Sequence, residues 1–400
     1  MSETAVVRTR APAGASQVQP IRVLMGIPAA GATAGGPALH LPMLVEDLRA
    51  AGHAVLTMPY GRWAERESLP LKMWHQLYDL VRYPVFVWRM RPDVVHLNSS
   101  FDPKAIARDA PFALVTRLLR KPLFIKWHGS EPEYLETRSL VWRPLVRLLL
   151  ANTRAIGVLS TEEQAAVRRC AAAPACYVVR NGLDLARYER RTDLHTRLGI
   201  PAGAPLLLFI GRVLRAKGLR EAVSAMRLLS PELGAHLIVV GDGPDRSEAQ
   251  ALAGRLGVTG QVHFLGQIPE AEAVDYYCGC DILVFPTAHP EGFPMTVFQS
   301  LAAGLGIVTT RIRATADYLH EPQNACFVPP RDAQAVATAV EDLLRDPARL
   351  ATMRSANRAL ARRFERRTVA AEIGAIYGEI LQRGPAARDP ARTRHDGEDV

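Results

Sequence analysis

The sequence has few lysines, few cysteines and no long apolar run, and the last two of these shortages argue against particular classes of protein. No stretch approaches the roughly 18 unbroken apolar residues that a membrane-spanning helix requires. Residues 1–20 carry Arg8 and Arg10 without an apolar core behind them, so we expect that this segment is not a secretory signal. The spacing of the five cysteines fits neither a zinc site nor a redox pair, so we expect reduced thiols and a cytoplasmic protein.

The basic side chains are almost all arginines, because the 400 residues include only five lysines: Lys72, Lys104, Lys121, Lys126 and Lys217. The formal net charge of +9 favours anionic partners such as sugar nucleotides, anionic lipid head groups or nucleic acid. A nucleic-acid role would rest on charge alone, since the chain lacks the aromatic platforms and recognition motifs of such proteins. We therefore expect no nucleic-acid partner.

The length of the chain predicts two domains of about 150–200 residues each. Short apolar runs alternate with helical patterns, which is typical of a parallel sheet covered on both faces. In the first half we expect strands at 21–28, 54–58, 93–98, 122–127, 155–160 and 176–179. In the second half we expect them at 206–211, 235–241, 261–265, 281–286, 306–310 and 325–328.

Turn residues in segment 179–184 interrupt the alternation and predict a hinge. We expect a flexible tail at 1–20, a first doubly wound domain at 21–183 and a second one at 184–365. A helix at 366–383 should pack back toward the first domain, and another flexible tail is expected at 384–400. Two such halves place a ligand cleft between them, at the carboxyl ends of their strands.

Two segments of the second half carry the chemistry. After the strand at 206–211, Arg212 and Lys217 precede a helix, where backbone N–H groups and cations favour a diphosphate. The alternative is a solvated basic turn, which the scarcity of lysine makes the weaker interpretation. Glu291 stands before a second helix, and Gln299 lies about 12 Å further along, at roughly 1.5 Å per residue. That span suits two polar groups that hold the sugar and the ribose of one nucleotide.

The core of the chain, about 21–381, resembles the family 4 retaining glycosyltransferases, also called glycosyl transferases group 1, which have the GT-B fold of two Rossmann-like domains facing each other across a cleft. The matching motifs occur in the family's order and are Gly35-Gly36, His128-Gly129-Ser130-Glu131, Asn181-Gly182-Leu183-Asp184, Gly211-Arg212, Lys217-Gly218, Gly241-Asp242-Gly243-Pro244 and Glu291-Gly292-Phe293-Pro294.

The resemblance implies a role for each of these positions. Gly35 and Gly36 would let the donor diphosphate approach the backbone, and His128 would bind the donor sugar or the reacting centre. Arg212 and Lys217 would neutralise the leaving diphosphate. Glu291 would bind sugar hydroxyls, and the remaining donor-binding residues would shape that pocket or hold the base and ribose: Gly241, Gly266, Ile268, Gly292, Phe293, Pro294 and Gln299.

The implied reaction is transfer from a UDP- or GDP-sugar to a saccharide or lipid-linked saccharide, with retention and without a cofactor or metal. Arg212 and Lys217 would do what a divalent cation does in other transferases. Gln299 departs from the family, which usually has a glutamate there. Its amide oxygen still accepts hydrogen bonds, although more weakly than a carboxylate.

The acceptor side is expected in the first half. His96 and Asn98 end one predicted strand, and Glu131 follows His128 at the end of another. A histidine at a strand end also serves as a purely structural hydrogen-bonding group, which is the alternative for His128. Aromatic and basic residues alternate in segments 73–91 and 142–150, which predicts either an interfacial helix on an anionic membrane or ordinary covering helices with snorkelling arginines.

Other functions fit the residues less well. A nicotinamide dehydrogenase would have a carboxylate after its second strand, where Tyr60, Gly61 and Arg62 stand. A sugar-nucleotide epimerase or a phosphorylase of the same fold is a closer alternative, but it accounts less well for Arg212, Lys217 and Glu291 together. A catalytically weak nucleotide-sugar-binding subunit stays an alternative because of Gln299.

Overall fold

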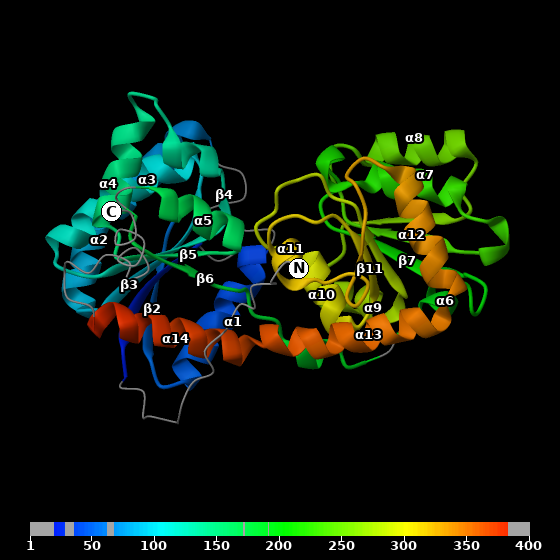
Figure 1. Ribbon diagram of the computed structural model, residues 1–400. Coiled ribbons are helices and arrows are strands. Elements are labelled where there is room, and N and C mark those ends of the chain that lie inside the picture. The colour runs from blue at the N-terminus through cyan, green and yellow to red at the C-terminus, as the bar shows by residue number, and fades with distance from the viewer. Residues whose placement is uncertain (1–19, 29–35, 62–67, 171–172, 191, 383–400) are drawn as a thin grey trace, which may run out of the picture.

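The computed structural model describes residues 20–28, 36–61, 68–170, 173–190 and 192–382, and it consists of two α/β halves side by side (Figure 1). The tails predicted at 1–20 and 384–400 lie outside the described residues, apart from residue 20. All twelve predicted strands occur, with ends that differ by a few residues from the expected ones. No described helix has both the length and the apolar character that crossing a membrane requires.

The first half contains a six-stranded parallel sheet in the order β2-β1-β3-β4-β5-β6. Its strands are β1 (Arg22–Ile27), β2 (Ala54–Pro59), β3 (Val94–Phe101), β4 (Leu123–Ser130), β5 (Ala155–Val158) and β6 (Ala175–Val178). Its helices are α1 (Gly36–Ala50), α2 (Leu69–Met90), α3 (Pro103–Leu118), α4 (Trp142–Asn152) and α5 (Thr161–Arg169), with the 3-10 helix η1 (Pro132–Glu136).

The alternation of strand side chains sorts the core of this half into two layers. Leu24 packs in the cluster that includes Ile106 of α3, whereas its neighbours Val23 and Met25 pack in the cluster that includes Leu44 of α1. Successive side chains of a strand point to opposite faces, so an unbroken apolar run fills both layers. This is why the buried strands are visible in the sequence.

The second half contains a parallel sheet in the order β12-β11-β10-β7-β8-β9. Its strands are β7 (Leu206–Ile210), β8 (His236–Val240), β9 (Val262–Gly266), β10 (Ile282–Phe285), β11 (Gly306–Thr309) and β12 (Cys326–Phe327). Its α-helices are α6 (Leu194–Leu198), α7 (Leu219–Leu228), α8 (Arg246–Leu256), α9 (Glu270–Gly279), α10 (Met295–Ala303), α11 (Ala314–Tyr318), α12 (Ala333–Arg345) and α13 (Pro347–Ala361). Its 3-10 helices are η2 (Leu185–Tyr188), η3 (Arg215–Lys217), η4 (Pro231–Leu233) and η5 (Arg362–Phe364).

The chain crosses between the halves twice, and the two crossings lie side by side. Leu183 donates its N–H to the carbonyl of Phe364 over 2.7 Å, and Arg366 donates to the carbonyl of Leu183 over 2.9 Å. A Cβ on Gly182 would lie 2.9 Å from the Cα of Arg366, so this approach requires glycine. Helix α14 (Arg366–Gln382) then packs on α1 of the first half, as Figure 1 shows along the lower edge of the molecule.

Candidate active site

The two halves touch near the carboxyl ends of their strands, where ligands bind in open α/β sheets. Gly292, in the loop after β10, lies so close to the first half that an added Cβ would come within 2.9 Å of Leu159 Cδ1. Thr161, at the start of α5, donates its N–H to Asp317 Oδ2 over 2.7 Å. These contacts bring the loop after β10 next to the segment after β5 and bound the candidate site.

A short ion pair joins two residues that the sequence assigned to different motifs. Lys217 Nζ lies 2.5 Å from Glu291 Oε1, and the two side chains are only 15% and 19% exposed. Lys217 ends η3, whereas Glu291 lies in the loop before α10, and Lys217 Nζ also lies 5.7 Å from the centre of the Phe285 ring. Partial burial strengthens the attraction between such charges. The pair places a cation and a carboxylate together at the strand ends of the second sheet.

The loops after β7 and β8 pack against each other through glycines. A Cβ on Gly241, which has φ of 127°, would lie 2.0 Å from the carbonyl oxygen of Gly211, which has φ of 144°. Only glycine combines this backbone conformation with this proximity. Arg212 follows on the same loop, is exposed, and makes no ion pair within the described residues. Its guanidinium is therefore available to an anion at the cleft.

His128 is held by a chain of hydrogen bonds that fixes its tautomer. Asn98 donates its Nδ2–H to the carbonyl of Gly26 over 3.1 Å, so its Oδ1 is the acceptor for His128 Nε2–H at 3.0 Å. Burial, followed by repulsion from His40 and Lys126, holds the pKa of His128 well below its usual value. The ring is therefore neutral, and its Nδ1 carries a lone pair that has no hydrogen-bond partner within the described residues. That lone pair can accept a hydrogen bond from a hydroxyl group.

The acceptor-side prediction needs one correction. His96 is fully buried, and its Nδ1 lies 2.6 Å from the hydroxyl of Tyr377 on α14, so it belongs to the core and does not line an acceptor surface. Burial lowers the pKa of His96 to about 3, which keeps the ring neutral. Asn98 acts on His128 from the next inward-facing position of β3, and Glu131 is exposed at the end of β4. Partial desolvation of its carboxyl group, then repulsion from Asp102, raises the pKa of Glu131.

Gln299 is buried and makes two hydrogen bonds that the sequence did not indicate. Its Oε1 accepts from the hydroxyl of Tyr277 over 2.8 Å, and its Nε2 donates to Glu270 Oε1 over 3.1 Å. Burial raises the pKa of Glu270, while Arg187 and Gln299 lower it. A carboxylate therefore stands beside the amide, at the start of α9.

The other predicted donor-binding residues lie in the loop before α10, at and after the end of β9, and around the start of α1. Phe293 is buried and stacks on Phe298 at 3.7 Å between ring centres, so it anchors its loop in the core, and Pro294 is the buried residue that precedes α10. Gly266 ends β9 and accepts the N–H of Gly241 over 2.7 Å, and Ile268 follows it, half-buried against the second core. Gly36 begins α1, and Gly35 lies outside the described residues.

Two residues near the site escaped the sequence analysis. Lys126, on β4, is completely buried, and its Nζ donates to the carbonyl of Arg180 over 2.9 Å and to Asn181 Oδ1 over 2.8 Å. The apolar strand around Lys126 gave no indication that its side chain is buried. The scarcity of lysine in this chain was the one feature that could have drawn attention to it. Arg313, before α11, reaches from the second half to the carbonyl of Ser130 at 3.2 Å.

Arg313 also has an unusual backbone, with φ of 43° and ψ of −118°. Its side chain is 5% exposed and lies 3.5 Å from a carboxylate oxygen of Glu162 and of Glu163. A non-glycine residue with this conformation is strained and persists only where its surroundings hold it. The contacts across the cleft supply that restraint.

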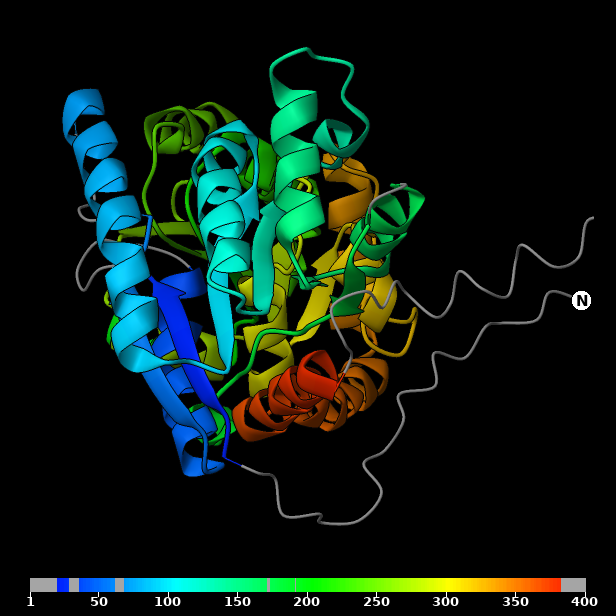
Figure 2. The ribbon, with the colours of Figure 1, turned by 90° about the vertical axis from the view of Figure 1, so that its left-hand side faces the viewer.

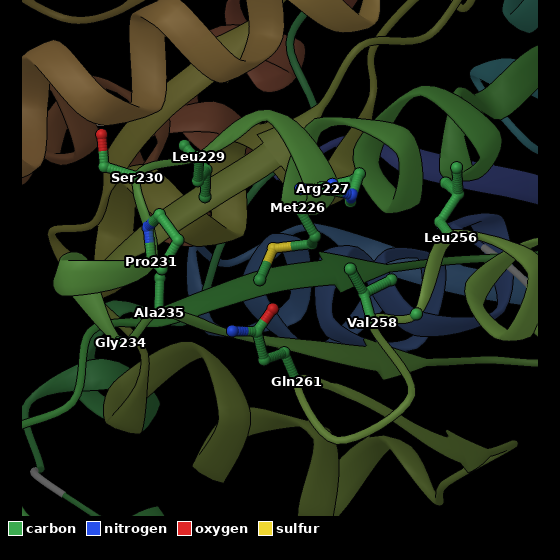
Figure 3. Close-up of a pocket in the computed structure, with 11 residues that line it drawn as sticks. Met226, Arg227, Leu229, Ser230, Pro231, Gly234, Ala235, Leu256, Val258 and Gln261 are labelled. Carbon is green, nitrogen blue, oxygen red and sulfur yellow. The ribbon is translucent and has the colours of Figure 1, made fainter.

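Within the described ranges, no group of three or more His, Cys, Asp or Glu side chains is arranged to hold a metal ion. A pocket of about 340 Å³ near the start of β8 is lined by residues such as Met226, Pro231 and Gln261, and Figure 3 shows these side chains. None of the predicted site residues lines this pocket, and it lies at the opposite end of β8 from Gly241. It is therefore separate from the candidate active site.

Comparison with known proteins places the C-terminal half in a characterised group. Residues 190–360 match the family described as glycosyl transferases group 1. A D-inositol 3-phosphate glycosyltransferase from Xylanimonas cellulosilytica is 31% identical over 222 residues, which is 52% of this chain and 52% of that protein. The chain thus spans about half the length of the curated relatives that it matches.

Similarity to solved structures extends over nearly the whole chain. Sucrose-phosphate synthase from Thermosynechococcus elongatus has a TM-score of 0.73 at 20% identity, covering 90% of this chain and 99% of that one. HepE from Anabaena, in complex with UDP, has a TM-score of 0.71 at 18% identity, covering 90% and 100%. The predicted fold, two Rossmann-like halves in the GT-B arrangement, is confirmed.

Proposed function

Because the chain belongs to the glycosyl transferases group 1 family, we propose that it transfers a sugar from a nucleoside-diphosphate sugar to an acceptor hydroxyl. The observation that carries this proposal is the Lys217–Glu291 pair at 2.5 Å, at the strand ends where Arg212 is also available. The two cations would meet the diphosphate, and the carboxylate would bind hydroxyls of the sugar. HepE, which has the same fold, was solved with UDP, and we propose a UDP- or GDP-sugar as the donor of this chain.

We propose a retaining reaction that needs no metal ion. The bond from the anomeric carbon to the diphosphate oxygen breaks, the acceptor oxygen attacks from the same face, and its proton passes to the departing diphosphate. Arg212 and Lys217 stabilise the negative charge that develops on the leaving group, and preorganised groups of this kind commonly supply much of an enzyme's rate enhancement. Neutral His128 accepts a hydrogen bond through Nδ1 and orients the sugar.

Glu270, the carboxylate next to Gln299, argues against the alternative of a catalytically weak subunit. Glu270 lies within hydrogen-bonding distance of the Gln299 amide, so a carboxylate is retained beside the position where the family usually carries one. We propose that Glu270 and Gln299 act together as the polar end of the donor site. Full catalytic function is therefore the interpretation that we favour.

The acceptor is proposed to be a saccharide or lipid-linked saccharide in the synthesis of a polysaccharide or glycoconjugate. The test is to incubate the protein with UDP- and GDP-sugars in the presence of EDTA and to follow the anomeric proton signals by NMR. Transfer, or slow hydrolysis of one donor with water as acceptor, with the anomeric configuration retained, supports the proposal. Inversion at the anomeric carbon, or transfer that requires added metal, would contradict its mechanistic part.

A further inference from the structure

Helix α2 carries large apolar side chains on a face that no part of the described structure covers. The exposed fractions of Trp74, Leu77, Val81, Val85 and Trp88 are 62%, 55%, 67%, 52% and 71%. These positions recur every three or four residues, so they form one stripe along the helix. We call these five residues the outer stripe.

The outer stripe is separate from the face by which α2 joins the protein. Tyr83 and Val87 are each 1% exposed and pack in the core cluster that contains Ile106 of α3. The helix is therefore apolar on two opposite faces, one in the core and one in contact with solvent. A single exposed apolar side chain needs no explanation, but a continuous stripe that includes two tryptophans marks a surface that binds something.

The charged residues of α2, and the residue that follows it, are mainly basic. Lys72, Arg82, Arg89 and Arg91 lie on or just after α2, against one carboxylate, Asp79. The guanidinium of Arg82 lies 4.7 Å from the centre of the Tyr78 ring and 5.0 Å from that of Phe86, which keeps this cation beside aromatic surface. An apolar stripe with tryptophans and flanking cations is the composition of a helix that lies in a membrane interface.

A second surface feature of the first half has the same character. Leu140 and Val141, just before α4, are 92% and 62% exposed. Next to them is a cavity of about 510 Å³ whose lining includes four arginines: Arg138, Arg143, Arg147 and Arg169. The carboxylate in this lining, Glu136, pairs with Arg169 at 3.2 Å, so the cavity keeps an excess of positive charge.

The first turns of α2 and the segment before α4 lie at the same end of the first half, the end away from α13 and α14 (Figures 1 and 2). Figure 2 shows α2 standing at the outer edge of this half. A surface at this end of the first half therefore lies next to both the first turns of α2 and the segment before α4.

We propose that the outer stripe and the Leu140–Val141 segment form a docking surface for an anionic phospholipid bilayer. The apolar side chains enter the acyl boundary, and the arginines around them, including those of the cavity, bind lipid phosphate groups. A second copy of this chain is a poorer partner, because it would bring the same cations against each other. The surface deepens the proposed function, since it would hold the enzyme where lipid-linked acceptors are found, but its binding does not depend on sugar transfer.

The experiment measures sedimentation of the full chain with phosphatidylglycerol-containing vesicles and with vesicles of phosphatidylcholine alone, without any donor sugar. Binding to the anionic vesicles, reduced by high salt and accompanied by a blue shift of tryptophan emission, is expected. The double variant Leu77→Ser/Val81→Ser should bind about tenfold more weakly, as should Lys72→Glu/Arg89→Glu. Leu228→Ser and Arg227→Glu, at exposed positions of α7 in the other half, serve as matched controls and should bind like the unaltered chain.

Unfolding curves establish that each variant is folded before its binding is compared. Equal binding of the stripe variant and its control would overturn the proposal, as would equal binding to both kinds of vesicle. A dimer in light scattering that dissociates in Leu77→Ser/Val81→Ser, together with no vesicle binding, would assign the surface to a second copy instead. Because no donor is present, failure of vesicle binding leaves the proposed transferase activity untouched, and the reverse also holds.

Discussion

Lys217 and Glu291 form a partly buried ion pair of 2.5 Å between the 3-10 helix after β7 and the loop after β10. Each side chain orients the other, so the pair presents a defined cation and a defined carboxylate to a ligand at the strand ends. In the proposed reaction the ammonium group faces the leaving diphosphate and the carboxylate faces the sugar. This division of roles makes different predictions for the two residues.

Replacing Lys217 should damage the chemical step. Lys217→Ala removes a donor that stabilises the leaving group, and a single group of this kind contributes about 10²–10³ in rate. We expect kcat for donor turnover to fall by about that factor while the melting temperature changes little. Arg215→Ala, in the same 3-10 helix, is the matched control, because Arg215 is exposed and its side chain has no assigned role. Near-normal turnover in folded Lys217→Ala would remove Lys217 from the mechanism.

Restoring the family's glutamate at position 299 should harm the protein. In Gln299→Glu a second carboxylate would face Glu270, which now accepts a hydrogen bond over 3.1 Å and whose pKa burial already raises. Two facing carboxylates cannot both ionise easily, so we expect a loss of about 1–3 kcal/mol in unfolding free energy at neutral pH.

The pH dependence of this loss separates charge repulsion from altered packing. Repulsion raises the carboxyl pKa values in the folded state, so the missing stability should return as the pH falls and one carboxyl group becomes protonated. Urea unfolding of both proteins at about pH 5 and about pH 8 measures the effect. A variant that is as stable as the unaltered chain and binds donor more tightly would contradict the account of Glu270.

Lys126 should make stability depend on pH above neutrality. Burial lowers the pKa of Lys126 from 10.5 to about 7. Between these values the unfolded chain holds a proton that the folded chain lacks, so unfolding free energy rises with pH, by at most about 1.4 kcal/mol per pH unit. Urea unfolding should show this rise in the unaltered chain and a smaller rise in Lys126→Met. Lys104→Met, at an exposed lysine, should keep the full slope, and equal slopes in all three proteins would contradict the prediction.

Arg313 offers a test of strain at the domain contact. Both Arg313→Ala and Arg313→Gly lose the bond to the Ser130 carbonyl, but only glycine adopts φ of 43° and ψ of −118° without strain. Arg313→Gly should therefore be more stable than Arg313→Ala by about 1 kcal/mol. Both should show a larger radius of gyration in X-ray scattering, because the contact across the cleft is lost. An Arg313→Ala protein as stable as Arg313→Gly would show that the backbone is not strained.

The twelve strands could be predicted because buried parallel strands have apolar sequences that end in glycine or polar residues. The run that forms β7 and its following Gly211 is the clearest case. It also indicated Arg212, Lys217 and Glu291, since these residues stand at strand ends where ligands bind. It did not predict that Lys217 and Glu291 touch, because that contact depends on how two loops of separate βα units pack.

Side chains that face inward from regular elements were the hardest to interpret. His96 looked like a cleft residue because it ends a predicted strand, but β3 continues to Phe101, which leaves His96 in the core under Tyr377. The burial of Lys126 was not predicted, because a lysine inside a strand is expected to reach solvent. Segment 73–91 forms a covering helix, because α2 packs on the core with one face, and the sequence did not predict which of its apolar residues stay exposed on the other face.

The most direct test of the central claim is a thermal-shift comparison of UDP-, GDP-, ADP- and TDP-sugars in the presence of EDTA. A ligand that binds only the folded protein stabilises it, by about 2.7 kcal/mol at a concentration of 100 times its Kd. We predict that one nucleotide class raises the melting temperature clearly and that the shift is smaller in Lys217→Ala. No shift with any donor, in a protein shown to be folded, would contradict the donor site described for the second half.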